Sequence, residues 1–167
     1  MRWIPLLVIW FLSLSSGTYI HNSIEDFNSR IIAMVSLFYM TFLGTILFTP
    51  LAFDGLNIYI MPAGIGRVNL YHIFVDIGFV ENIILTMPLG FLIKRFYSRT
   101  SLLAMIPIGL MTGATIETMQ YYLSHVFWIN RTSDISDVVS NGIGIVIGAS
   151  IALAYHYIYD KKYQIIT

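Results

Sequence analysis

The chain contains no cysteine, which excludes disulfide bonds and thiol catalysis. Charged residues make up only 11% of it, against about 25% in an average soluble domain. The net charge is zero, so no basic excess predicts binding to a nucleic acid. The four histidines have no metal-ligand spacing and no HExxH motif is present. The sequence therefore predicts no metal site and no cofactor.

The remaining composition is strongly apolar, with 57% hydrophobic residues and a mean hydropathy of +0.75. A helix that crosses a bilayer needs about 20 mostly apolar residues. Candidate spans lie near residues 3–20, 31–48, 79–93, 101–123 and 138–159. The sequence predicts an all-α fold, in which about five transmembrane helices form a polytopic membrane bundle with one longer extracellular loop. We expect residues 1–167 to form a single domain.

The first apolar stretch has two interpretations. Arg2 and the small-residue sequence SLSSG fit a cleaved signal peptide. The distribution of basic residues favours a retained helix instead. Lys94, Arg95 and Arg99 form the densest basic loop, which the positive-inside rule places in the cytoplasm. With five spans, the N-terminus then lies outside and the C-terminus, with Lys161 and Lys162, lies inside.

This orientation places two connections outside the cell, residues 51–78 and 124–137. The longer one has short β-prone runs, NIYI and VNLYHIF, around a centre rich in glycine and proline. It is too apolar for a flexible linker. We expect an ordered extramembrane loop, with a hairpin that lies on the bilayer surface.

A polar stripe begins the fifth span. Asp134, Asp137, Asn141, Gly144 and Gly148 are spaced three, four, three and four residues apart, which places them on one face of a helix. The outer end of this face is polar. Its inner end is a GxxxG pair, which allows another helix to approach closely.

The fourth span repeats the design with Gly109, Gly113, Glu117, Gln120 and Ser124. Glu117 lies within the apolar stretch, where a charge costs at least ~2.5 kcal/mol on the mildest insertion scale. It should therefore face the interior of the bundle. The same helix face carries the GxxxG pair of this span.

The third span has a weaker version, with Asn82, Thr86 and Gly90 four residues apart and Glu81 beside Asn82. We expect the three stripes to face one another, so that the polar halves form a cluster open to the outer face. The predicted helix-packing residues are Gly90, Gly109, Gly113, Gly144 and Gly148. The predicted polar-cluster or ligand-binding residues are Glu81, Asn82, Glu117, Gln120, Arg131, Asp134, Asp137 and Asn141.

Arg131 is the only cation in the connection between the fourth and fifth spans apart from histidine. Its planar guanidinium can bridge carboxylates, so we expect it to pair with Glu117, Asp134 or Asp137. A simpler alternative for the two aspartates is helix capping, with Ser133 or Asp134 as the N-cap and Asp137 in the first turn. Capping does not explain Glu117, Gln120 or Asn141, which lie deeper. These could hold helices together or bind a ligand.

Three segments resemble the VanZ-like family of bacterial membrane proteins: ENIILTMPLGFL (81–92), IETMQ (116–120) and RTSDISDVVSNGIGIVIG (131–148). Their compound spacing resembles an acid-amide pair before P-x-G, then E-x-x-Q, then R-x-x-D-x-x-D-x-x-x-N-x-x-G-x-x-x-G. VNLYHIF (68–74) is similar to the family's N-L-x-P-F segment, but His72 and Ile73 stand where a proline is expected. The resemblance implies a multi-pass protein of the bacterial cytoplasmic membrane. The family's founding member is associated with resistance to the glycopeptide teicoplanin.

These observations favour a non-enzymatic envelope protein whose outward polar cluster binds a membrane lipid or wall-precursor group and affects teicoplanin-type susceptibility. The expected partners are membrane lipids, and a cell-wall precursor or a glycopeptide. One alternative is a membrane enzyme that acts on lipid-linked substrates by carboxylate acid–base chemistry. The other is a structural or transport subunit whose polar cluster only packs helices.

Overall fold

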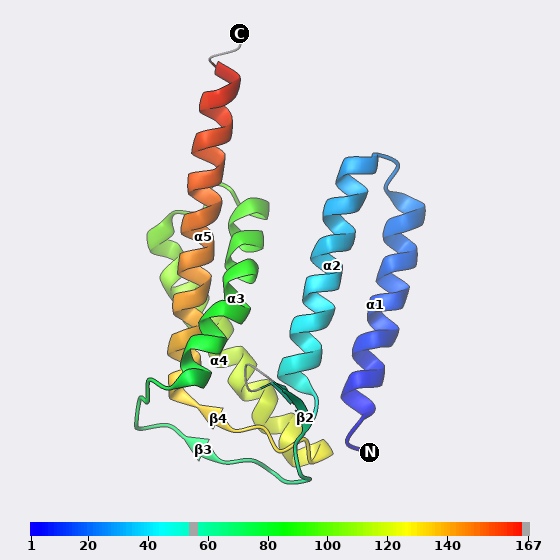
Figure 1. The fold of residues 1–167 in the computed structure, drawn as a ribbon, viewed down its shortest axis with the longest axis vertical. Coiled ribbons are helices and arrows are strands. Elements are labelled where there is room, and N and C mark those ends of the chain that lie inside the picture. The colour runs from blue at the N-terminus through cyan, green and yellow to red at the C-terminus, as the bar shows by residue number, and fades with distance from the viewer. Residues whose placement is uncertain (54–56, 165–167) are drawn as a thin grey trace. The chain divides into compact units, whose positions relative to one another are not determined.

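The structure is a computed structural model that describes residues 1–53 and 57–164, with the backbone alone at position 53 and over 159–164. The side chains of Lys161 and Lys162 thus lie outside the described part. The helices are α1 (Ile4–Ser23), α2 (Phe27–Phe48), α3 (Ile77–Phe96), α4 (Leu102–Phe127) and α5 (Ile135–Gln164). Short strands are β1 (Leu51–Phe53), β2 (Ile58–Ile60), β3 (Val68–Asn69) and β4 (Ser133–Asp134). Figure 1 shows their course.

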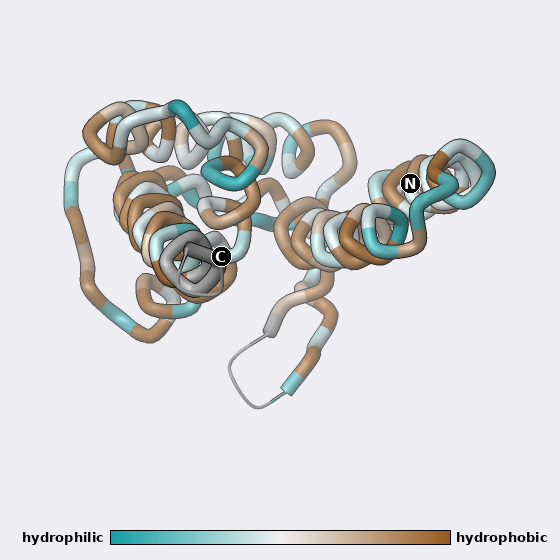
Figure 2. The backbone as a smooth tube through the Cα atoms, turned by 90° about the horizontal axis from the view of Figure 1, so that it is seen from above, coloured by the Kyte–Doolittle hydropathy of each residue, from teal (hydrophilic) through white to brown (hydrophobic). Residues whose placement is uncertain are grey.

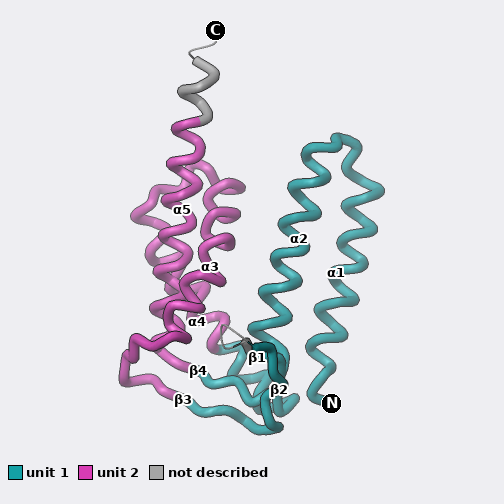
Figure 3. Tube along the Cα trace, in the orientation of Figure 1, with its two compact units in different colours: residues 1–68, 118–133 teal, residues 69–117, 134–167 magenta. Residues whose placement is uncertain are grey.

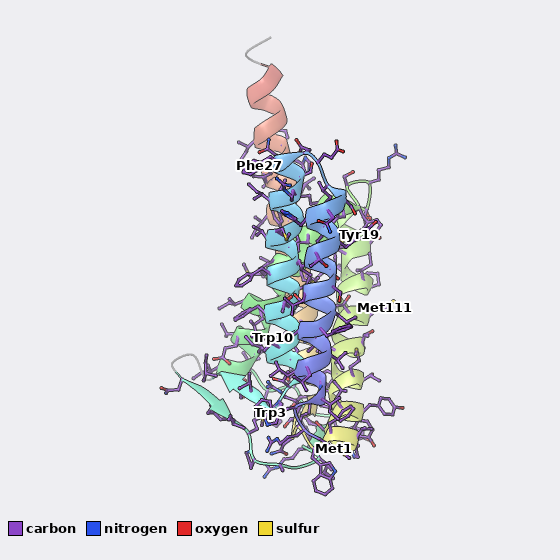
Figure 4. All side chains as sticks on the ribbon, turned by 90° about the vertical axis from the view of Figure 1, so that its right-hand side faces the viewer. Met1, Trp3, Trp10, Tyr19, Phe27 and Met111 are labelled. Carbon is purple, nitrogen blue, oxygen red and sulfur yellow. The ribbon has the colours of Figure 1, made fainter. Side chains whose placement is uncertain are left out.

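Each of the five helices is long and apolar enough to cross a membrane. Figure 2 shows them as predominantly hydrophobic along their length. The α1 and α2 spans bury few of their side chains, and Figure 4 shows large ones projecting from α1, including Trp10 and Tyr19. In a bilayer these side chains meet lipid instead of water. The predicted fold class, a membrane bundle of five helices, is confirmed.

The helices α2 and α3 begin at polar caps that a hydropathy profile does not detect. The carboxylate of Asp26 accepts a hydrogen bond from Ser29 N at 2.7 Å, so α2 begins at Phe27 and not near residue 31. The carboxylate of Asp76 accepts one from Phe79 N at 2.9 Å, and α3 begins at Ile77. The helices therefore extend beyond the apolar stretches at one or both ends.

The residues form two compact units (Figure 3). Unit 1 consists of residues 1–68 and 118–133, and unit 2 of residues 69–117 and 134–167. The last part of α4 thus belongs to unit 1 and its first part to unit 2. Whether the chain behaves as a single domain stays a prediction.

In unit 1, α1 packs on α2. The hydroxyl groups of Ser13 and Thr41 lie 2.6 Å apart across this contact, and Arg2 donates to the carbonyl of Met61. After α2, β1 pairs antiparallel with β2, in a register that aligns Ala52 with Tyr59. The connection between α2 and α3 thus contains a hairpin, formed by residues that precede the turn-rich centre. The run after that centre supplies β3, which pairs with β4.

In unit 2, α3 packs on α5. Met105, Ile145 and Ala149 are fully buried at the centre of an apolar core. The half-buried side chains packed against them are Leu89, Ile93, Leu102, Ile108 and Val146. At the end of α3, the buried Lys94 ammonium donates to the carbonyls of Ser98 and Thr100. This core holds α3, the first part of α4 and α5 as the frame for the polar residues of unit 2.

Candidate functional site

Glu117 is a buried carboxylate on α4, with only 6% of its surface exposed. Its Oε2 accepts a hydrogen bond from the backbone N–H of Asp134 at 2.8 Å. A carboxylate removed from water needs such donors to offset the loss of hydration. Glu117 thereby ties α4 to the residue that precedes α5.

Asp134 caps α5. Its Oδ1 accepts hydrogen bonds from Ser136 N at 2.8 Å and from Asn69 Nδ2 at 2.9 Å. Burial raises the pKa of this carboxyl, but the hydrogen bonds from Asn69 and Ser136 outweigh burial and hold the pKa below its ordinary value. The capping interpretation of Asp134 therefore describes its geometry, and Asp137 occupies the first turn.

Asn69 and Ser136 fasten the loop before α3 to the start of α5. Asn69 Nδ2 also donates to His72 O at 2.6 Å, and Ser136 Oγ accepts from Phe74 N at 3.0 Å. Sequence reasoning did not single out either residue. The N-L pair of the VNLYHIF segment was the available signal for Asn69, whereas Ser136 carries no signal beyond its place between two aspartates.

Asn141 lies about one helical turn beyond Asp137 on α5, with 1% of its surface exposed. Neither its Nδ2 nor its Oδ1 has a hydrogen-bond partner among the described residues. Its backbone carbonyl accepts from Thr86 Oγ1 of α3 at 3.1 Å. The helix is therefore anchored at this level through its backbone, while the amide side chain is buried without a bond.

Glu81 and Asn82 lie on α3 and are half-buried. Glu81 Oε1 is buried without a hydrogen-bond partner in the part of the chain that the structure describes. The backbone carbonyl of Asn82 accepts from Thr86 Oγ1 at 2.7 Å. The Thr86 hydroxyl thus contacts carbonyls of both α3 and α5.

Gln120 and Arg131 belong to unit 1, where both bind the end of α2. The buried Gln120 donates from Nε2 to Leu47 O at 3.0 Å. Arg131 donates to the carbonyls of Ile46 and Leu51, and from Nε to Thr49 O at 3.2 Å. The last carbonyls of a helix lack partners within the helix and carry the negative end of its dipole. The Arg131 guanidinium supplies hydrogen-bond donors to these carbonyls and a positive charge that interacts favourably with the dipole.

Ser124 fixes the backbone of Arg131. Its hydroxyl accepts from Arg131 N at 2.8 Å and donates to Arg131 O at 3.1 Å. These bonds give Arg131 a structural role in unit 1 that the sequence did not indicate. The expected pairing of Arg131 with a carboxylate stays a prediction.

The five predicted helix-packing glycines of unit 2 lie where two helix backbones meet. A Cβ added at Gly90 would lie 2.6 Å from the carbonyl carbon of Ile145, and one at Gly144 would lie 2.5 Å from Ile83 O. On the α4 side, a Cβ at Gly109 would lie 2.8 Å from Gly142 O, and one at Gly113 would lie 2.6 Å from Val138 O. Gly148 faces the backbone of Met87 and Phe91. Only glycine permits approaches this close.

The family model described as VanZ/LLP1 matches residues 3–156. The chain belongs to the VanZ/LLP1 family. Comparisons with curated proteins and with solved structures gave no match. Together with its five candidate spans, family membership identifies a multi-pass membrane protein. The match covers all the residues of the VanZ-like segments, including Glu117, Arg131 and Asn141.

In this VanZ/LLP1 chain, the polar end of α5 combines two kinds of group. Glu117 and Asp134 are carboxylates that already accept backbone or amide N–H groups, whereas Asn141 offers a donor and an acceptor that have no partner among the residues described by the structure. Within the described ranges, no cluster of three or more His, Asp or Glu side chains could hold a metal ion. The Asn141 amide can both donate and accept a hydrogen bond.

Proposed function

We propose that this chain is a non-enzymatic protein of the bacterial cell membrane that binds a polar group of an envelope lipid or a lipid-linked wall precursor. The binding site lies at the polar end of α5, where Glu117 of α4 joins Asp137 and Asn141 of α5. Binding there changes susceptibility to glycopeptides of the teicoplanin type. The observation that carries this proposal is the buried, unbonded amide of Asn141.

A buried amide without a partner costs about 1–3 kcal/mol, and proteins leave few such groups unpaired. A residue that only held helices together would use its amide to bond the neighbouring helix. Asn141 does not, since Thr86 bonds its backbone carbonyl instead. A ligand that carries both a donor and an acceptor, such as an amide or a hydroxyl group, would satisfy both atoms.

Replacing Asn141 by leucine is expected to separate stability from function. Leucine has a similar volume and no polar atoms, so the purified variant should be as stable as the wild type or more stable. In a deletion strain, it should fail to restore the wild-type response to a panel of glycopeptides. Thermal unfolding in detergent and membrane abundance measure the first effect, and inhibitory concentrations measure the second.

Thr86→Val is the matched control, because it removes the hydroxyl that joins α3 to α5 and leaves the Asn141 side chain intact. It should lower the thermal midpoint, by the loss of about 0.5–1.5 kcal/mol per hydrogen bond, and keep the glycopeptide response. A full glycopeptide response from Asn141→Leu at normal abundance would show that the amide binds no ligand. The proposal would then be wrong.

The proposed orientation places the polar end of α5 outside the cell, because the positive-inside rule puts Lys94 and Arg95 at the end of α3, and Arg99 after it, in the cytoplasm. An alkaline phosphatase fused after Arg99 should therefore be inactive in intact cells. The matched fusion after Trp128 should be active, since one more span precedes it. The reverse pattern would place the polar end in the cytoplasm and rule out a ligand from the outer leaflet.

A further inference from the structure

Residues 70–77 of unit 2, which run from the end of β3 to the first residue of α3, present a nearly continuous apolar surface. Its exposed fractions reach 88% at Tyr71, 75% at Val75 and 74% at Ile77. The large exposed side chains of the segment are Leu70, Tyr71, Ile73, Phe74, Val75 and Ile77. Exposing such a surface to water would be unfavourable, because the free energy falls when apolar area is removed from water.

The segment carries little charge, and its one carboxylate is already stabilised by the start of α3. Asp76 is its only acidic or basic residue besides His72. The Asp76 carboxylate accepts from Phe79 N and faces the N-terminal end of α3, where the helix dipole favours a negative group. Figure 2 shows the segment as a mostly hydrophobic stretch of chain.

The backbone of the segment is bonded in a way that suits a medium poor in water. Two side chains outside the apolar run bind it: Asn69 Oδ1 accepts from His72 N at 3.1 Å, and Ser136 Oγ accepts from Phe74 N at 3.0 Å. Asn69 Nδ2 donates to His72 O. In a bilayer, backbone groups left without partners are the main cost of irregular structure. Asn69 and Ser136 reduce this cost.

The apolar surface also continues onto a membrane span. Ile77 is the first residue of α3, and the exposed Val80 and Ile84 follow on the same helix. Figure 3 shows the segment beside the first turns of α3 and α5, within unit 2. A surface continuous with the lipid-facing side of a span is in position to meet the same lipid.

We propose that residues 70–77 form an interfacial anchor that is immersed in the bilayer at the boundary of headgroups and acyl chains. Its partner is the phospholipid of the leaflet in which α3 and α5 begin. Tyr71 and His72 suit the headgroup level, whereas Ile73, Phe74 and Val75 suit the acyl boundary. The anchor would hold the start of α5 at the membrane surface through Ser136. It does not depend on the proposed ligand of Asn141.

The absence of cysteine makes a direct test possible, because any introduced cysteine is the only labelling site. We would label Tyr71→Cys with the fluorophore NBD and reconstitute the full chain into phosphatidylethanolamine–phosphatidylglycerol vesicles. The matched control is Glu25→Cys, at an exposed polar position between α1 and α2. Label at position 71 should show blue-shifted emission, quenching by lipids with a doxyl group high on the acyl chain, and protection from iodide. Label at position 25 should show emission without the blue shift, little quenching by doxyl lipid, and strong quenching by iodide.

Val75→Cys, also highly exposed, repeats the test in case Tyr71→Cys fails to fold. Equal quenching by iodide at the segment and at position 25 would place the segment in water and overturn the proposal. Protection from both iodide and doxyl lipid would mean that a protein surface covers the segment, and would overturn it as well. Thermal unfolding of each labelled protein verifies that the compared samples are folded.

Discussion

Replacing Gly148 by alanine is expected to destabilise this protein more than any other single-methyl change considered. A Cβ at position 148 would lie 2.8 Å from both Met87 C and Phe91 N, with the Met87 carbonyl oxygen nearer still. These are backbone atoms of α3, which cannot rotate away as a side chain can. The helices must separate, and α3 and α5 would lose contact along the core that contains Ile145 and Ala149.

Overpacking of a core costs about 1–3 kcal/mol, and we expect the upper end or more for Gly148→Ala because the clash is with backbone. The measurements are the thermal midpoint in detergent and the amount of protein in the membrane. Gly17→Ala is the matched control, since its Cβ would lie 3.6 Å from Leu37 Cδ2, an ordinary contact. Alanine is the better helix former by about 1 kcal/mol, so the control should be neutral or stabilising. Equal midpoints for the two variants would contradict the close α3–α5 contact.

Arg131→Ala is expected to have the second largest effect, by unfastening the end of α2. The guanidinium binds the carbonyls of Ile46, Thr49 and Leu51. A hydrogen bond to a charged group contributes about 1.5–3 kcal/mol to stability. Loss of the hydrogen bonds to these three carbonyls should therefore lower the free energy of unfolding by on the order of 3 kcal/mol or more. Thermal unfolding and limited proteolysis in the segment that follows α2 would measure this loss.

Two further variants separate geometry from charge. Arg131→Lys keeps the charge but replaces a planar fork with a single ammonium, so its stability should lie between those of wild type and Arg131→Ala. Arg67→Ala removes an exposed cation of the same unit and should leave the midpoint unchanged. Should Arg131→Ala instead remain as stable as the wild type while glycopeptide susceptibility changes, Arg131 would act on a ligand, as the sequence alone indicates.

The sequence was sufficient to predict the five membrane helices and the family. An apolar run long enough to cross a bilayer has few alternatives, because every backbone group in lipid must be bonded within the segment. Helix ends were less accurate, since Asp26 and Asp76 extend α2 and α3 beyond the apolar residues by capping them. Capping depends on local geometry, to which hydropathy is insensitive.

Spacing along one helix indicated which residues share a face, as with Asp137, Asn141, Gly144 and Gly148 on α5. It could not indicate what each face meets. Arg131 binds carbonyls about 80 residues away in the chain, and Asn69 binds Asp134 across a similar separation. The position and register of separate segments decide such contacts, and no local pattern records them.

The sequence by itself therefore determined that the chain crosses the membrane, where its helices lie and which of their faces are polar, because these properties follow from hydropathy and helical periodicity. Only the tertiary structure decided the partners. Strand β1 pairs with β2, Arg131 and Gln120 bind carbonyls at and after the end of α2, and the Asp134 backbone N–H binds Glu117. The tertiary structure also buried the Asn141 amide without a hydrogen bond to any residue in the described ranges. Hydrogen-bond satisfaction is a property of atoms brought together in space, and residue order alone does not specify it.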